Sequence, residues 1–251
     1  TLTATTIYGC VDSAVETITV YSQPQAAFNS TNVCHGFITD FTDLSTTPAP
    51  GNIVTWQWNF ADATPFVNDT STSHLYANPG NYNVVHTVIS DEGCVDSVIQ
   101  TIIVHPNPVV DFIGEPDEGC SPLLVDFHDF SGILTGLNAQ WDWSFGDNNF
   151  SSEQNPSHYF INTSSTLPAI YDITLKVTSD EGCQTVVRKD DYISVFPTPK
   201  AGFSFTPQTT TVIYPQITFT DLSQDATTWN WNFGDYQVNN TSSFQEPVYN
   251  Y

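Results

Sequence analysis

An all-β chain of tandem sandwich-type domains is predicted by three observations. First, a Trp-x-Trp-x-Phe marker occurs three times, at Trp56–Phe60, Trp141–Phe145 and Trp229–Phe233, with starting positions 85 and 88 residues apart. Second, the segments between turn signals are short and alternate between apolar and polar residues. Third, no stretch keeps a helical 3.6-residue period. A marker that recurs at a fixed spacing indicates repeated domains.

The other markers divide the chain into repeats. Phe-x-Asp-x-Ser begins at Phe41, Phe127 and Phe219, and a Gly-Cys pair ends at Cys10, Cys94 and Cys183. By this alignment residues 1–22 match only the end of a repeat, and residues 199–251 match only the beginning of one. Residues 23–106 and 107–198 are predicted to be two whole domains, each large enough for one modest core. We therefore expect the chain to be part of something longer.

The Trp-x-Trp-x-Phe segments are predicted to be strands with one aromatic face. Residues at i, i+2 and i+4 of a strand point to the same side, and the residues between the aromatics are polar in all three copies. We therefore expect these aromatics to face the core rather than to form an exposed sugar platform. The predicted core aromatics are Trp56, Trp58, Phe60, Trp141, Trp143, Phe145, Trp229, Trp231 and Phe233.

Later in each repeat, alternating runs flank tight-turn residues. Asp91-Glu92-Gly93 and Asp180-Glu181-Gly182 have the composition of hairpin turns. About seven short strands per repeat predict a β-sandwich of immunoglobulin type. The joints contain Pro106-Asn107-Pro108 and Pro197-Thr198-Pro199, and such short proline-rich segments are extended and stiff.

The five cysteines occupy two repeat positions. Cys34 and Cys120 come seven residues before the Phe of Phe-x-Asp-x-Ser, whereas Cys10, Cys94 and Cys183 follow a glycine near the end of a repeat. We predict the disulfides Cys34–Cys94 and Cys120–Cys183, with Cys10 bonded to a residue outside this chain. Each bridge would contribute about 4 kcal/mol and indicates an oxidising compartment. The alternative is five reduced thiols; zinc is disfavoured because no Cys-x-x-Cys occurs.

The charge is strongly acidic. Four basic residues face 27 acidic ones, for a net charge of −23. Nucleic acid is an unexpected partner because phosphate binding needs basic patches, and no apolar run is long enough to predict insertion into a membrane. A solvated acidic surface is the simplest interpretation, and a calcium-binding surface is the alternative.

No catalytic motif or cofactor site is predicted, and we expect no enzymatic activity. The histidines show no metal-ligand spacing, and His74 and His158 are expected to hold a turn. Asp62, Asp147 and Asp235 end the aromatic strands, and we expect each carboxylate to cap the following turn by accepting backbone N–H bonds. A structural Ca²⁺ ion at these aspartates is the alternative.

The marker residues resemble the polycystic kidney disease (PKD) domain. The best match is Trp141–Asp147 with Asn155-Pro156-Ser157-His158. Two positions depart from the pattern: Ala61 stands where glycine is usual, and Ala169 replaces the glycine present at Gly80. The resemblance covers essentially the whole chain and implies tandem immunoglobulin-like β-sandwiches.

The cysteine positions and the Pro-x-Pro joint are similar to long PKD arrays of Bacteroidota surface proteins, including SprB-like gliding-motility adhesins. This resemblance implies type IX secretion, the cell exterior and a structural stalk whose partners are neighbouring domains and anchoring or motility machinery. It also suggests O-glycosylation at Ser13 and Ser97, within Asp-Ser-apolar triplets. The alternative function is a carbohydrate- or protein-binding accessory module of a secreted protein. Polymerisation by strand exchange between copies is disfavoured, because Val212 stands where Cys10 would need a partner.

Overall fold

The computed structural model describes residues 1–164, 166–236 and 240–251. Every regular element in these ranges is a β-strand, which confirms the prediction of an all-β fold. No helix capable of crossing a membrane occurs in the described ranges.

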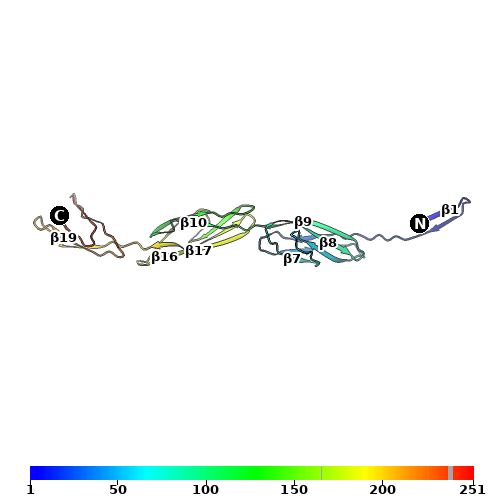
Figure 1. Ribbon diagram of the computed structural model, residues 1–251, viewed down its shortest axis with the longest axis horizontal. Helices are drawn as coiled ribbons and strands as arrows, with labels where there is room; N and C mark the ends of the chain where they lie inside the picture. The colour runs from blue at the N-terminus through cyan, green and yellow to red at the C-terminus, as the bar shows by residue number, and fades with distance from the viewer. Residues whose placement is uncertain (165, 237–239) are drawn as a thin grey trace. The chain divides into compact units, whose positions relative to one another are not determined.

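The first whole repeat is a sandwich of two sheets, with β7, β8 and β9 labelled in Figure 1. One sheet has the order β3 (Phe28–Ser30), β5 (Thr39–Asp43), β7 (Thr72–His74). The other has the order β4 (Val33–Cys34), β9 (Val95–His105), β8 (Gly80–Ser90), β6 (Ile53–Asn59). The long β8–β9 hairpin is antiparallel throughout, whereas the short β4 pairs in parallel with the end of β9.

The second repeat has the same plan, with β10, β16 and β17 labelled in Figure 1. One sheet has the order β10 (Phe112–Glu115), β12 (Leu123–Asp129), β15 (Ser157–Phe160). The other has the order β11 (Glu118–Cys120), β17 (Gln184–Phe196), β16 (Ala169–Ser179), β13 (Asn138–Ser144), β14 (Phe150–Ser151). The register of β16 and β17 shifts between Tyr171 and Ile173, at a bulge that the first repeat lacks.

Each whole repeat has its own aromatic core. The second and third aromatics of the marker are buried, as Trp58 and Phe60 in one repeat and Trp143 and Phe145 in the other. The first tryptophans, Trp56, Trp141 and Trp229, are only half-buried. In the partial third repeat Trp231 is half-buried and Phe233 is buried.

The two partial repeats flank the whole ones. At the N-terminal side, β1 (Leu2–Thr5) and β2 (Val11–Ala14) form an exposed hairpin. At the C-terminal side the sheets are β18 (Phe203–Thr206), β19 (Gln216–Asp221), β22 (Val248–Asn250) and β20 (Trp231–Asn232), β21 (Thr241–Ser242).

An apolar cavity of about 640 Å³ opens in the partial third repeat. Its lining includes Phe203, Phe219, Trp231 and Phe233. The corresponding aromatics of the whole repeats pack against the hairpin made by β8 and β9 or by β16 and β17. The cavity therefore corresponds to the core face that this hairpin covers in the whole repeats.

By contacts the chain divides into two compact units. One contains Thr1–Asn107 together with Glu181–Cys183, and the other contains Pro108–Asp180 and Gln184–Tyr251. The short segment Glu181–Cys183 is the tip of the turn between β16 and β17. This segment belongs to the first unit because Cys183 forms a disulfide with Cys34.

Candidate functional site

The cysteines are the chemically distinctive feature of this chain, and their positions within a repeat follow from the strands. Cys34 lies on β4, where it pairs with His105 at the last residue of β9. Cys120 occupies the same position on β11, where it pairs with Phe196 at the last residue of β17. The strand partner of each cysteine is the last residue before a proline-containing joint. Each cysteine therefore lies at the end of its repeat where the chain leaves, which we call the outgoing end.

The second cysteine position lies at the opposite end of the same strand. Cys94 precedes the first residue of β9, in a turn closed by hydrogen bonds from Ser90 N to Cys94 O and from Gly93 N to Ser90 O, both 2.9 Å. The chain enters the repeat here, because Gln23 Nε2 donates to Val95 O (2.9 Å) and Ala26 N donates to Asp96 Oδ2 (2.8 Å). Cys94 is therefore at the incoming end.

This placement shows that the predicted pairing of Cys34 with Cys94 is wrong. The 11 residues of β9 at about 3.3 Å per residue separate the two ends of the strand by roughly 35 Å. A disulfide needs Cα atoms no more than about 7 Å apart. The predicted Cys120–Cys183 bridge fails for the same reason, because the 13-residue β17 separates those two residues. The spacing of the cysteines places two of them in each repeat, but it carries no information on the direction of the strand between them.

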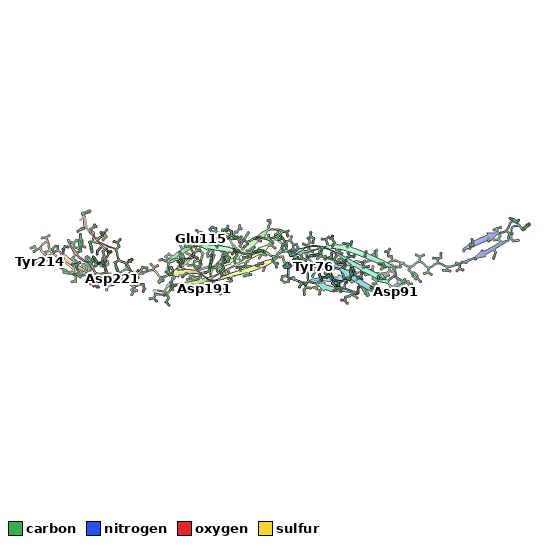
Figure 2. All side chains as sticks on the ribbon, viewed as in Figure 1. Tyr76, Asp91, Glu115, Asp191, Tyr214 and Asp221 are labelled. Atoms are coloured by element: carbon green, nitrogen blue, oxygen red, sulfur yellow. A yellow bond between two sulfur atoms is a disulfide. The ribbon has the colours of Figure 1, made fainter. Side chains whose placement is uncertain are left out.

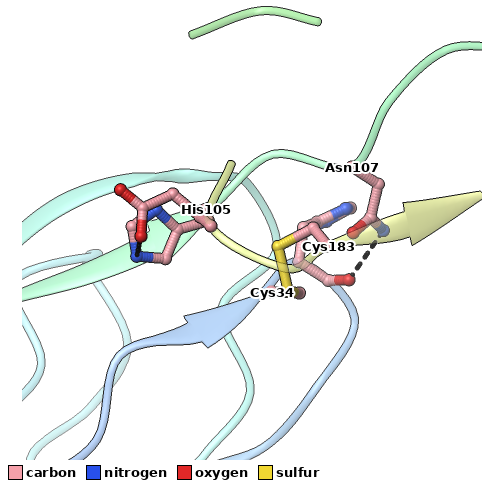
Figure 3. Close-up of a disulfide and its surroundings, with 6 residues drawn as sticks. Cys34, His105, Asn107 and Cys183 are labelled. Carbon is pink, nitrogen blue, oxygen red and sulfur yellow. Dashed lines mark hydrogen bonds and ion pairs between the residues drawn. A yellow bond between two sulfur atoms is a disulfide. The ribbon is translucent and has the colours of Figure 1, made fainter. Parts of the chain in front are cut away.

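The structure instead contains a Cys34–Cys183 disulfide, 149 residues apart in sequence, with a Cα–Cα distance of 5.5 Å. It joins the outgoing end of the first repeat to the hairpin turn of the second. Figure 3 shows two neighbouring interactions: Asn107 Nδ2 donates to His35 O (2.9 Å), and His105 Nε2 lies 3.8 Å from the Glu181 carboxylate. Cys10 and Cys120 are free and exposed, and Cys94 is free and half-buried.

The aspartate of Phe-x-Asp-x-Ser fixes the first tryptophan of the marker in each repeat. The indole Nε1 of Trp141 donates to Asp129 Oδ2 (2.7 Å), and Ser131 N donates to Asp129 Oδ1 (2.9 Å). The corresponding pairs are Trp56 with Asp43 and Trp229 with Asp221, each at 2.8 Å. The half-burial of these tryptophans follows, because each indole reaches an aspartate at the margin of the core. Hydrogen bonds from the side chain and from the backbone of Ser223 lower the pKa of Asp221, which is labelled in Figure 2, to about 2.

The aspartate that ends the aromatic strand forms a second repeated unit, which we call the Asp–His clasp. In the second repeat His158 Nε2 lies 2.8 Å from Asp147 Oδ2, and the His158 ring stacks on Phe145 at 4.3 Å. The first repeat has the same arrangement in His74, Asp62 and Phe60. In the third, Tyr249 Oη donates to Asp235 Oδ2 (2.6 Å) and stacks on Phe233, and this bond raises the pKa of Tyr249 to about 12.

The clasp carboxylates also accept bonds from the turn that follows. Asn149 N donates to Asp147 Oδ1 (3.0 Å), and Thr64 N donates to Asp62 Oδ1 (3.2 Å). Burial alone would raise the pKa of Asp147, but the hydrogen bonds from His158 and Asn149 outweigh it and lower that pKa. Protein donors therefore occupy these oxygens. Among the described residues, no group of three or more His, Cys, Asp or Glu side chains is placed to hold a metal ion.

The two predicted glycosylation sites are accessible. Ser13 lies on the exposed β2, and Ser97 is an exposed residue of β9. Their modification stays a prediction.

The repeats belong to a known family. The PKD domain model matches residues 21–104 and 105–195, so this chain belongs to the PKD domain family. Among solved structures, the first PKD domain of the Vibrio cholerae metalloprotease PrtV is 29% identical, with a TM-score of 0.30, over 33% of this chain and 96% of that one. The first PKD domain of Vibrio anguillarum Epp is 27% identical, with a TM-score of 0.30, over 36% and 96%. A 1.5-MDa bacterial ice-binding adhesin is 9% identical, with a TM-score of 0.36, over 88% and 87%.

Proposed function

We propose that this chain is a spacer segment of a long cell-surface adhesin or gliding-motility filament, outside the cell and without catalytic activity. The single observation that carries the proposal is the Cys34–Cys183 disulfide. Tension applied at the two ends of these repeats passes from Cys34 to Cys183 through this bond, so the segment between the two cysteines, which holds most strands of both repeats, carries no load, whereas β3 and β17 stay on the load path. A protein that only binds a soluble ligand gains nothing from such a path, whereas a stalk under load keeps both repeats folded.

The surface supports the same function. The net charge of −23 keeps crowded repeats soluble and apart, and the second and third marker aromatics of the two whole repeats are buried in the cores rather than exposed on a flat outer face. Export by a type IX system and attachment to motility machinery rest on the resemblance to Bacteroidota arrays, and they are part of the proposal.

The alternative is a carbohydrate- or protein-binding module, and it makes a different prediction. Affinity electrophoresis of the 251-residue chain through gels that contain polysaccharides separates the two. A spacer migrates at the same rate in every gel. Retardation by one polysaccharide, abolished by replacing an exposed aromatic such as Phe66 or Phe150 with alanine, would establish a binding module and refute the spacer function.

A second experiment uses the whole parent protein on intact cells. Replacing residues 23–198 with two unrelated immunoglobulin-like domains of the same length preserves adhesion or gliding if this segment is a spacer. Deleting the segment, which serves as the matched control, shortens the reach of the distal domains. Loss of adhesion in the replacement at normal surface abundance would contradict the proposal.

A further inference from the structure

The free cysteines Cys94 and Cys120 occupy the same structural positions as the two bonded ones. Cys120 corresponds to Cys34, because each pairs in parallel with the last residue of the last strand of its repeat. Cys94 corresponds to Cys183, because both follow a left-handed glycine in the same Asp-Glu-Gly turn, with φ of 79° at Gly93 and 82° at Gly182. The bonded pair therefore shows which position bonds to which.

The bonded pair defines a direction along the chain. The cysteine at the outgoing end of one repeat bonds to the turn cysteine of the next repeat. A bond within one repeat is excluded by the length of β9 and β17. A bond between Cys94 and Cys120 also does not follow this direction. Cys94, a turn cysteine, needs an outgoing-end cysteine from the repeat before it, whereas Cys120 belongs to the repeat after it.

We propose that Cys94 and Cys120 are disulfide sites for two flanking repeats of the same long chain. Cys94 bonds to an outgoing-end cysteine of the preceding repeat, and Cys120 bonds to the turn cysteine of the following repeat. Cys10, in a turn closed by the same pair of bonds from Thr6 N and Gly9 N, bonds one repeat further back. Each joint then carries one disulfide, and each whole repeat contributes a cysteine to two joints.

The chemistry needs an oxidant, which we take to be an external disulfide. By thiol–disulfide exchange, two protein thiols and one external disulfide yield one protein disulfide and two external thiols. The exposure of Cys10 and Cys120 and the partial exposure of Cys94 leave these sulfurs open to such exchange.

The series of disulfides is interrupted where a repeat lacks the outgoing-end cysteine. Val212 stands at the outgoing-end position of the repeat that begins at residue 199, and it is fully exposed. A repeat without a cysteine at this position offers no outgoing-end thiol to the turn cysteine of a later repeat. The disulfide series holds whether the array is a spacer or a binding module, so its failure and the failure of the proposed function are distinguishable.

The test is disulfide mapping of the full-length native protein, alkylated without reduction and then digested. We expect Cys34 joined to Cys183, Cys94 joined to a peptide from the preceding repeat, and Cys120 joined to a Gly-Cys peptide from the following repeat. Alkylated Cys94 and Cys120, or a bond between Cys34 and Cys94, would overturn the proposal.

Two matched variants of the same protein separate a specific bond from adventitious oxidation. Cys120→Ser should expose one new thiol, in the turn of the following repeat, and Cys94→Ser should expose one new thiol in the preceding repeat. Labelling that appears at scattered cysteines, or at none, contradicts the assignment. Folding of both variants is checked by unchanged recovery of the Cys34–Cys183 peptide.

Discussion

The aspartate of Phe-x-Asp-x-Ser connects the two sequence markers of each repeat, because it accepts a hydrogen bond from the first tryptophan of Trp-x-Trp-x-Phe. Each aspartate of Phe-x-Asp-x-Ser accepts an indole N–H and a backbone N–H at once, as Asp129 does from Trp141 and Ser131. Such a group is costly to remove, because its donors lose their partner while they stay partly shielded from water. The aspartate of Phe-x-Asp-x-Ser therefore makes a tertiary contact with the aromatic strand.

Replacement of Asp129 tests this role. We expect Asp129→Ala to lower the free energy of unfolding by about 1–3 kcal/mol, because the indole N–H of Trp141 is left unsatisfied. The measurement is denaturant unfolding followed by tryptophan fluorescence. The control Glu153→Ala removes an exposed carboxylate of the same repeat and should change stability by less than about 0.5 kcal/mol. Equal effects of the two variants would show that the bond contributes nothing specific.

The Asp–His clasp predicts sensitivity to acid. The pKa values of Asp62 and Asp147 are lowered in the folded chain, where burial is outweighed by hydrogen bonds from the turns and the histidines. A carboxyl whose pKa is lower in the folded state stabilises the fold above its unfolded pKa, and this contribution is lost as the pH falls through the folded pKa. Thermal unfolding should therefore shift to lower temperature below about pH 4.

The variant Asp147→Asn should reduce that shift while keeping the shape of the side chain. Its melting temperature should lie below that of the wild type near neutral pH and approach it in acid, as scanning calorimetry would measure. A constant difference at every pH would instead mean that the ionisation of Asp147 is unrelated to stability. Glu153→Gln is the matched control.

The two whole repeats differ in the pairing of their last two strands, and this difference explains a glycine. Gly146 has φ of 79°, and a Cβ there would lie 2.6 Å from the carbonyl oxygen of Asp172. Asp172 is the residue at the bulge between β16 and β17. The first repeat pairs β8 and β9 without a bulge and carries Ala61 at the corresponding position, with φ of 60°. The alanine is therefore tolerated because no displaced carbonyl approaches it.

Two reciprocal substitutions test this explanation. Gly146→Ala should destabilise the second repeat by roughly 2 kcal/mol or more, from backbone strain and the steric clash together. Ala61→Gly should change the first repeat by no more than about 1 kcal/mol. Urea unfolding of each single variant would show the asymmetry, and similar values for the two would contradict the role of the bulge.

The strands were predictable from local sequence, whereas their long-range partners were not. Alternation at Trp56, Trp58 and Phe60 indicates a half-buried strand, and Asp91-Glu92-Gly93 indicates a hairpin. Nothing local shows that Asp147 meets His158, or that Cys34 lies roughly a strand's length from Cys94. One sequence signal could have corrected the predicted disulfide pairing. A long strand directly after Cys94 carries the chain to the opposite end of the repeat, where Cys34 lies.

At the scale of the whole molecule, the chain carries tandem PKD domains, and one covalent bond, Cys34–Cys183, joins the first whole repeat to the second. The Cys34–Cys183 bond joins residues 149 positions apart in sequence, and the segment between them contains most of both whole repeats. Under tension between the chain ends, that segment is bypassed. Stability of the repeats under load then depends on one covalent bond and less on the unfolding rate of each sandwich.

The most direct test is single-molecule stretching of the 251-residue chain by its two ends, with Cys10, Cys94 and Cys120 replaced by serine. Reduction, or the variant Cys34→Ser, should release an additional total length of about 500 Å, from the segment between two cysteines that are 149 positions apart, at about 3.5 Å for each residue. A release of only about 200 Å on Cys34→Ser, in a chain that keeps Cys94 and Cys120, would instead indicate bridges within each repeat. That result, or no change on reduction, would contradict the account.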